Sequence, residues 1–273
     1  MYLKYMHKNI IGEKLDLKNP KGFNAKLQWL KLYDRKPEYC RMVDKYEVKK
    51  YVAQKIGEEF LIPTLGIYNR FEEIDFDALP NEFVLKCTHD SGSVVICRDK
   101  ATFDMKAAKK KLKKKMRTNL FWHGREWVYK GVKPRIIAEK YMQDGEDKDL
   151  KDYKFYCFGG VSKFLYISQG LSDYSTARVS YVSLDWEKEP FHRSDFATFE
   201  ELPSKPVSFD EMIEFCKILS QDIPFLRVDF YEINRKLYFG EMTFFPGAGF
   251  TALEPAEWEA ELGEWITLPE KKV

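Results

Sequence analysis

Apolar residues recur with a helical period in several stretches of the chain. The spacing of Phe23, Leu27 and Leu30 predicts a short amphipathic helix that begins after Pro20. Similar spacing predicts helices over residues 45–56, 104–117 and 209–219. The helix at 104–117 has only a narrow apolar stripe among many lysines, so we expect it to lie on the surface.

Shorter runs rich in β-branched and aromatic residues predict strands, and most of them come in pairs around a polar turn. Because such pairs form hairpins instead of alternating strictly with helices, we expect an α+β fold with a largely antiparallel core. The first pair encloses a polar loop, residues 88–92, that we expect to be flexible. The predicted pairs are 83–87 with 93–97, 152–158 with 163–168 and 225–231 with 236–242, and further extended segments are expected at 60–63, 135–141 and 177–184.

Composition and charge exclude several classes of protein. The chain has 273 residues, of which 44% are hydrophobic and 32% charged, as in a folded protein and unlike a disordered one. A net charge of +2 excludes general electrostatic binding to nucleic acid. No apolar run approaches the roughly 18 to 20 residues of a membrane-spanning helix. Residues 1–12 lack the pattern of a signal peptide, so we expect a cytoplasmic protein.

The cysteines and histidines are scattered and show no metal-binding spacing. There is no CxxC pair, so the sequence signals neither a zinc site nor a disulfide framework. We therefore expect buried structural thiols. The residues concerned are Cys40, Cys87, Cys97, Cys157 and Cys216 and His7, His89, His123 and His192.

Two acidic residues lie in apolar runs that are expected to form neighbouring strands. Asp229 and Glu241 would be available to a hard cation such as Mg²⁺, and Thr243 shares a strand face with Glu241. Arg227 shares the face of Asp229, which places a phosphate-binding charge beside the metal. The alternative is a structural Arg–Asp pair with Glu241 at a solvent-exposed edge, and the spacing leaves both interpretations open.

A lysine in the first hairpin has the surroundings of a phosphate-binding group. Lys86 precedes a Thr-His-Asp-Ser-Gly-Ser loop, so its ammonium is expected near backbone N–H groups and hydroxyls. The alternative is an ordinary hairpin tip. His89, Asp90 and Ser91 are contiguous and cannot converge as a catalytic triad, which excludes a hydrolase of that kind.

Five segments occur in an order and spacing that resemble the ATP-grasp superfamily. From about residue 19 to 265, the chain is similar to the TupA-like ATP-grasp proteins, which are associated with bacterial capsular and teichuronopeptide-type polymers. The segments are Val43-Asp44-Lys45 with a following helix and Ile62-Pro63, Phe83-Val84-Leu85-Lys86 with its Gly/Ser loop, Ile137-Ala138-Glu139-Lys140-Tyr141, Arg227-Val228-Asp229-Phe230, and Gly240-Glu241-Met242-Thr243.

The resemblance implies an ATP-grasp fold, in which two α+β lobes with largely antiparallel sheets enclose a nucleotide cleft. A short helical segment would precede the lobes. Residues 1–82 would form that segment and carry the first phosphate-binding lysine, residues 83–142 the small lobe, and residues 143–273 the large lobe with the magnesium site. About 80 residues precede the small lobe, too few for a large separate domain, so we expect an open substrate pocket.

The resemblance also implies roles for individual residues. Lys45, Lys86 and Lys154 would contact the nucleotide phosphates, and Arg227 would steady the transferred phosphate. Asp229 and Glu241 would bind Mg²⁺, while Thr243 stands where the family usually has asparagine. The remaining groups are Ser91, Gly92 and Ser93 as a lid over the phosphates, Glu139, Lys140 and Tyr141 as the adenine-binding hinge, Asp152 at the ribose, and Pro246, Gly247 and Gly249 at a substrate carboxylate.

The function implied is an ATP-dependent carboxylate–amine ligase that uses ATP and Mg²⁺ and forms an amide through an acylphosphate. It would attach an amino acid or amine to a sugar acid or peptide of a bacterial capsular or cell-surface polysaccharide precursor. Peripheral contact with a membrane-linked substrate would use the lysine-rich helix. The alternatives are a glycosyltransferase of capsule synthesis, for which Asp147-Lys148-Asp149 has the DxD form, and a non-catalytic polymer-binding module.

Overall fold

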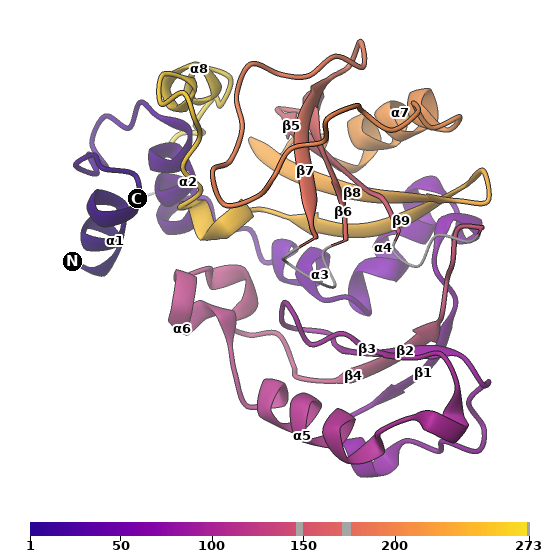
Figure 1. Ribbon diagram of the computed structural model, residues 1–273. Helices are drawn as coiled ribbons and strands as arrows, with labels where there is room; N and C mark the ends of the chain where they lie inside the picture. The colour runs from indigo at the N-terminus through magenta and orange to yellow at the C-terminus, as the bar shows by residue number, and fades with distance from the viewer. Residues whose placement is uncertain (146–149, 171–175, 272–273) are drawn as a thin grey trace. The chain divides into compact units, whose positions relative to one another are not determined.

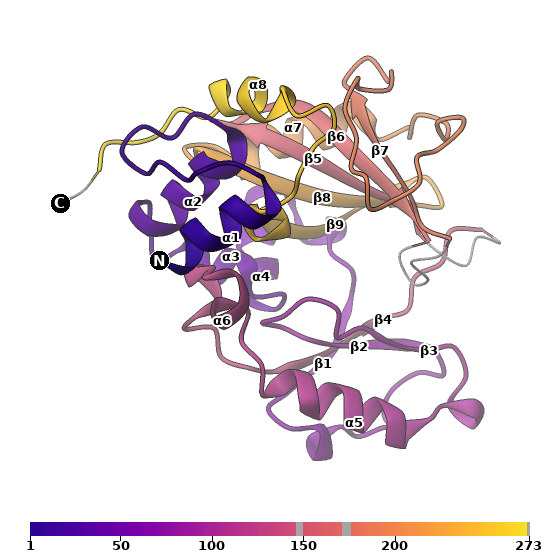
Figure 2. The same ribbon diagram turned by 60° about the vertical axis from the view of Figure 1, so that its left-hand side comes forward.

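The computed structural model describes residues 1–145, 150–170 and 176–271. The chain divides into two compact units, one of residues 36–142 and one of residues 1–35 with 143–273, and Figures 1 and 2 show the elements of each. We call them the inserted unit and the terminal unit. The three domains expected from the sequence, residues 1–82, 83–142 and 143–273, stay a prediction. One of their boundaries, after residue 142, is also a boundary between the compact units, whose other boundary lies after residue 35.

The inserted unit is built on a four-stranded sheet with the order β1-β4-β2-β3, in which all neighbours are antiparallel. The predicted hairpin is confirmed, since Phe83 pairs with Cys97 and Leu85 with Val95. The extended segment expected at 60–63 is confirmed only in part, because Leu61 has an extended backbone, but a 3₁₀ turn ends at Phe60 and the strand begins at Thr64. The elements are α3 (Tyr39–Val43), α4 (Glu47–Ile56), β1 (Thr64–Tyr68), β2 (Phe83–Cys87), β3 (Val95–Cys97), α5 (Met105–Met116), α6 (Leu120–Gly124) and β4 (Ile136–Lys140).

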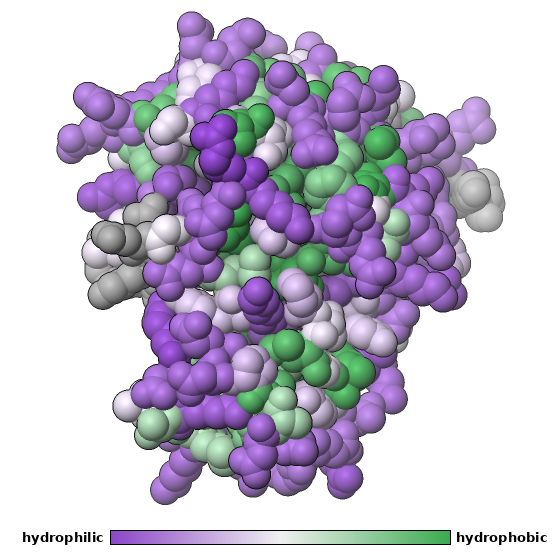
Figure 3. Space-filling model, turned by 90° about the vertical axis from the view of Figure 1, so that its right-hand side faces the viewer, coloured by the Kyte–Doolittle hydropathy of each residue, from purple (hydrophilic) through white to green (hydrophobic). Residues whose placement is uncertain are grey.

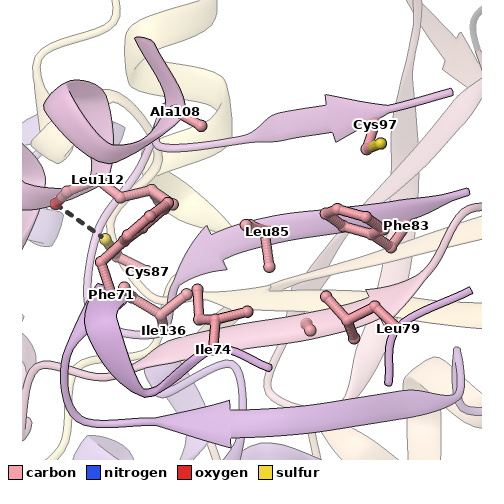
Figure 4. Packing of buried hydrophobic residues seen from close by; sticks show 11 residues of the cluster. Phe71, Ile74, Leu79, Phe83, Leu85, Cys87, Cys97, Ala108, Leu112 and Ile136 are labelled. Carbon is pink, nitrogen blue, oxygen red and sulfur yellow. Dashed lines mark hydrogen bonds between the residues drawn. The ribbon is translucent and has the colours of Figure 1, made fainter. Parts of the chain in front are cut away.

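A hydrophobic cluster joins α5 to one face of this sheet. Ala108 and Leu112 come from the apolar stripe of α5 and belong to one buried cluster with the strand residues Phe83, Leu85 and Cys87, in which Leu112 lies beside Cys87 (Figure 4). The Cys87 thiol lies 3.9 Å from the Leu112 carbonyl oxygen. The stripe predicted for residues 104–117 is therefore the buried face of a surface helix, and Asp104 caps it by accepting from the Ala107 N–H.

The terminal unit is built on a five-stranded antiparallel sheet with the order β7-β6-β5-β8-β9. Helix α7 lies along one face of this sheet in Figures 1 and 2. Its Phe209 packs on Phe155 of β5, at 5.7 Å between ring centroids. The elements are α1 (Tyr2–Ile10), α2 (Phe23–Tyr33), β5 (Asp152–Phe158), β6 (Val161–Gln169), β7 (Arg178–Ser183), α7 (Phe209–Leu219), β8 (Phe225–Ile233), β9 (Lys236–Thr243) and α8 (Trp258–Glu264).

Helix α2 covers part of the opposite face of the sheet. Its Phe23 packs edge-on against Phe225 at 5.1 Å and also contacts Phe158 and Tyr156. The part of the sheet that contacts α2 is therefore an aromatic surface made by residues of β5 and β8. The charged residues of the same two strands lie further along this face, where the candidate site begins.

A buried carboxylate fastens α2 to α8. Glu259 accepts hydrogen bonds from the backbone N–H and the side-chain amide of Asn24, both at 2.7 Å. Burial raises the pKa of Glu259 to about 7, although the bonds from Asn24 lower it.

We expect Glu259 to make stability depend on pH. Because the pKa is higher in the folded than in the unfolded chain, the folded state binds more protons between these values, and the free energy of unfolding falls as pH rises through them. Between about pH 4 and pH 8, the free energy of unfolding of the wild type should fall by about 3 kcal/mol relative to that of Glu259→Gln. Urea unfolding at several pH values measures this difference. A difference that does not change with pH would contradict this.

Among the described residues, no helix is long and apolar enough to cross a membrane. The face of the molecule shown in Figure 3 is largely hydrophilic, with apolar residues gathered in patches between hydrophilic ones. All five cysteines are free, and four of them are buried, as expected of structural thiols.

Candidate active site

One row of side chains crosses the whole sheet of the terminal unit. Glu241 of β9 pairs with Asp229 of β8, Asp229 with Lys154 of β5, Lys154 with Tyr166 of β6, and Tyr166 with Tyr181 of β7. Residues paired in this way lie on the same face of a sheet. The row therefore begins with two carboxylates and a lysine and ends with two tyrosines.

Ion pairs join the charged end of the row. Arg227 donates to both carboxylate oxygens of Asp229, at 2.7 and 2.6 Å, and to Glu241 at 3.0 Å. The Lys154 ammonium lies 2.9 Å from Asp152 and 3.4 Å from Asp229. Asp229 is almost fully buried, whereas the Glu241 side chain is 43% exposed. The cluster is thus shielded from solvent at Asp229 and accessible to solvent at Glu241.

Burial and charge act against each other on these groups. Burial raises the pKa of the Asp229 carboxyl, and the charges of Arg227 and Lys154 oppose that change. Burial lowers the pKa of Lys154, but the charges of Asp152 and Asp229 outweigh it, so the pKa is raised overall. The ammonium of Lys154 and the guanidinium of Arg227, whose pKa is also raised, both stay protonated at neutral pH.

The donor set at this end of the row fits Mg²⁺. This ion commonly takes one or two carboxylates from the protein and completes its shell with phosphate and water oxygens. Asp229 and Glu241 supply two carboxylates on one sheet face, and the Thr243 hydroxyl donates to Glu241 at 3.3 Å. The described residues contain no group of three or more acidic, histidine or cysteine side chains arranged for a metal. A magnesium site here would therefore depend on the oxygens of a bound phosphate.

The inserted unit holds a second charged cluster. Glu139 of β4 is almost fully buried and lies 2.5 Å from the ammonium groups of both Lys49 and Lys86. Lys49 also donates to the carbonyl of Ile62 at 2.6 Å. Burial raises the pKa of Glu139, but Lys86 and Lys49 outweigh it and lower the pKa. Lys86 thus pairs with a carboxylate, whereas the sequence led us to expect its ammonium near the hydroxyls and N–H groups of the loop.

The loop expected to be flexible is largely packed inside the inserted unit. Thr88, His89 and Asp90 are buried, and the Lys45 ammonium donates to the Asp90 carbonyl at 2.6 Å. The buried Ser93 hydroxyl accepts from the Cys87 N–H at 2.7 Å and donates to Asp90 at 2.6 Å. The side chain of Ser93 is therefore occupied within the loop. Ser91 and Gly92 are exposed.

The residues expected at the nucleoside differ in their surroundings. Lys140 is exposed at the end of β4, whereas Tyr141 accepts a hydrogen bond from Arg98 at 3.1 Å. Asp152 accepts from Ser168 at 3.4 Å in addition to its pair with Lys154. Glu139, Lys140 and Tyr141 belong to the inserted unit and Asp152 to the terminal unit.

The expected substrate loop has an unusual backbone, and side chains of α2 donate hydrogen bonds to its carbonyl groups. Gly247, Ala248 and Gly249 all have positive φ, of 55°, 55° and 63°. A Cβ at Gly249 would lie 2.6 Å from the Gln28 amide nitrogen, so glycine is needed for close packing there. Gln28 donates to the Gly249 carbonyl and Lys31 to the Ala248 carbonyl, each at 2.5 Å.

Sequence reasoning missed three functional candidates. Lys49 follows Lys45 by four residues, one helical turn, and could have been found from that spacing. Lys31 is fully buried and interrupts an apolar helical run, which is the kind of signal that deserves an explanation. Arg193 lies in a proline-punctuated loop without a recognisable pattern.

A match to a protein-family model covers residues 25–267, and the model is that of the TupA-like ATP-grasp proteins. The chain belongs to this family. Family membership confirms the resemblance read from the sequence, the ATP-grasp α+β fold and the predicted enzyme class, an ATP-dependent carboxylate–amine ligase. Among curated protein sequences, none matches the chain.

Several solved structures are similar to this chain at low identity. D-alanine–D-alanine ligase from Helicobacter pylori has 14% identity and a TM-score of 0.49, over 91% of this chain and 68% of that one. The Bacillus anthracis enzyme complexed with ATP has 16% identity and a TM-score of 0.45, over 92% and 69%. A RimK domain protein from Sphaerobacter thermophilus has 10% identity and a TM-score of 0.46, over 86% and 70%.

Proposed function

We propose that the protein uses ATP and Mg²⁺ to join a carboxylate-bearing sugar or polymer precursor to an amino acid or another amine, in the cytoplasm of a bacterium that builds a capsular or cell-surface polysaccharide. The observation that carries the proposal is the cluster of Arg227, Asp229, Lys154 and Glu241 on one face of a sheet in an ATP-grasp chain. Such a cluster supplies both fixed cations and metal-binding carboxylates.

The proposed reaction has two steps. The substrate carboxylate attacks the γ-phosphorus of ATP, and the bond between this phosphorus and the bridging β-phosphate oxygen breaks. ADP departs, and the products of this step are ADP and an acylphosphate. The amine then attacks the acyl carbon, the amide C–N bond forms, inorganic phosphate departs, and the amine nitrogen loses a proton. Little covalent chemistry falls to the protein, because positioning and charge neutralisation dominate phosphoryl transfer.

The proposal gives each charged residue a definite task. Arg227 and Lys154 hold fixed positive charge on the face where Asp229 and Glu241 would hold Mg²⁺. Bound Mg²⁺ would supply neutralisation of phosphate charge. In the inserted unit, Lys45 and Lys86 would contact the phosphates, with Lys86 held in place by Glu139.

The other expected residues have narrower or untested roles. The exposed Ser91 and Gly92 are the candidates for covering the phosphates, since the Ser93 hydroxyl is engaged within its loop. Backbone groups that follow Glu139 would form the hydrogen bonds to the adenine, because the Glu139 side chain is ion-paired with two lysines. Thr243 would act through Glu241, to which it donates. The roles of Lys140, Tyr141 and Asp152, and of Pro246, Gly247 and Gly249 at a substrate carboxylate, stay proposals.

Contact with a membrane-linked substrate through α5 also stays a proposal. Two of its lysines, Lys109 and Lys113, pair with Glu72 at 3.0 and 2.7 Å. Lys111 and Lys115 donate to the carbonyls of Val94 and Ser91. These contacts engage part of the charge of the helix within the inserted unit.

Nucleotide binding tests the proposal. We expect ATP with Mg²⁺ to raise the melting temperature of the wild type, because a ligand that binds only the folded state stabilises it by RT ln(1 + [L]/Kd). Glu241→Ala should lose the part of the shift that needs Mg²⁺. Glu201→Ala, an exposed acid in another loop of the terminal unit, should keep it.

The same measurement separates the ligase from the alternatives. A shift with a nucleotide sugar and none with any adenine nucleotide would contradict the proposal and favour a glycosyltransferase. The acidic motif that would support that activity, Asp147-Lys148-Asp149, lies outside the described residues. A polymer-binding module would bind polysaccharide without any response to ATP.

A further inference from the structure

A pocket lies at the β7 edge of the sheet in the terminal unit. It has a volume of about 540 Å³, and its walls come from β7 and from the loop of residues 188–198. Pockets of this volume hold small organic molecules. None of the site residues expected from the sequence lines it.

Rings in contact connect this pocket to the charged cluster. The Lys154 ammonium lies 5.9 Å from the ring of Tyr166, whose ring is 5.6 Å from that of Tyr181. Tyr181 in turn lies 5.0 Å from Phe191, and both line the pocket. The pocket is therefore the far end of the same row that begins with Glu241 and Asp229.

Arg193 gives the pocket a partly buried cation. Its Nε and Nη2 donate to the two carboxylate oxygens of Asp195, at 2.8 and 2.5 Å, and its guanidinium stacks on Phe196 at 5.0 Å. A guanidinium has five N–H donors, so this pair leaves the edge formed by Nη1 and Nη2 able to bind a second acceptor. The side chain of Arg193 lines the pocket and is 21% exposed, so part of it is accessible to a ligand.

The remaining walls combine apolar rings with hydrogen-bonding groups. Phe196 and Pro190 offer flat apolar surface, while Ser194 and Thr198 offer hydroxyls. Acids are present too: Glu189 lines the pocket, and Glu254 lies 3.6 Å from His192. A purely anionic ligand would be repelled by these carboxylates, whereas a sugar can donate hydroxyl hydrogens to them.

We propose that this pocket binds a hexuronate unit of the carboxylate-bearing substrate, a sugar ring that carries a carboxylate, next to the unit that reacts at Lys154. Arg193 binds the carboxylate, the acids accept from ring hydroxyls, and Phe196 contacts the ring face. The proposal rests on the proposed ligase function and adds a second binding site, for a hexuronate unit that does not react.

The test measures binding of methyl β-D-glucuronide, with methyl β-D-glucoside as its uncharged counterpart, by titration calorimetry. We expect the wild type to bind the glucuronide at least about tenfold more tightly than the glucoside, since a hydrogen bond to a charged group is worth that factor or more. Arg193→Gln should lose this preference. Arg70→Gln, which breaks an exposed Arg–Glu pair in the inserted unit, should keep it.

A second variant guards against misfolding of Arg193→Gln. Thr198→Trp fills the pocket from an exposed position while Arg193 stays, and it should lose binding of both sugars. Unchanged glucuronide binding in a folded Arg193→Gln or Thr198→Trp would overturn the subsite. So would the absence of binding, or equal binding of both sugars, in a wild type that shows the ATP shift. Absence of the ATP shift itself would instead overturn the ligase function.

Discussion

Asp229→Asn should lower ATP-dependent turnover by at least about 100-fold, the usual cost of removing one electrostatic contact to a transferring group. The substitution keeps the size of the side chain but removes the charge that sits between Arg227 and Lys154. The carboxylate lost is also one of the two proposed magnesium ligands. Initial rates of ADP release, with and without Mg²⁺, measure the effect.

Two further variants make this result interpretable. Glu73→Gln neutralises an acid of an exposed pair with Arg70 and should leave the rate unchanged. If Asp229→Asn does not fold, Glu241→Gln takes its place, because Glu241 is 43% exposed and its loss leaves no buried cation without a partner. Wild-type rates in a folded Asp229→Asn or Glu241→Gln would contradict the role given to this cluster.

Glu139→Ala should destabilise the protein by about 3 to 5 kcal/mol, the range measured when one partner of a buried ion pair is removed. Glu139 is almost fully buried between Lys49 and Lys86, so its loss leaves two ammonium groups side by side with little water. Urea unfolding at neutral pH measures the change in free energy.

Glu72→Ala is a matched control for this substitution. Glu72 also bridges two lysines, Lys109 and Lys113, but it is 45% exposed, so solvent screens the pairs and its removal should cost much less than that of Glu139. Equal costs for the two variants would contradict the account of Glu139. The pKa of Glu139 is lowered on folding, so its contribution is present above pH 4.5 and is lost as pH falls through the lowered value.

Local patterns predicted most of the elements near the site. The strands that carry Asp229 and Glu241 were predicted from their β-branched and aromatic residues, and the two-residue period placed Arg227 beside Asp229. Both facts follow from the geometry of one hairpin. The pairing of Lys154 with Asp229 needs β5 beside β8, which are separated by β6, β7 and α7, and no local pattern reports that order.

Contacts between distant segments account for what was missed. The pair of Lys49 with Glu139 joins residues 90 positions apart, and the buried part of the loop, residues 88–90 and 93, is held by hydrogen bonds that involve Lys45 and Ser93. A polar loop with such partners looks the same in sequence as an exposed one. Strand β1 was missed because its short segment, Thr64–Tyr68, has a glycine in place of a regular alternation.

Trapping the acyl intermediate tests the central claim most directly. Hydroxylamine replaces the amine and converts an acylphosphate to a hydroxamate, so the natural amine need not be known. With ATP, Mg²⁺ and a panel of uronic acids and peptides, the account predicts that one of these carboxylates gives hydroxamate, ADP and phosphate in equal amounts. No hydroxamate with any carboxylate, together with sugar transfer from a nucleotide sugar, would contradict it.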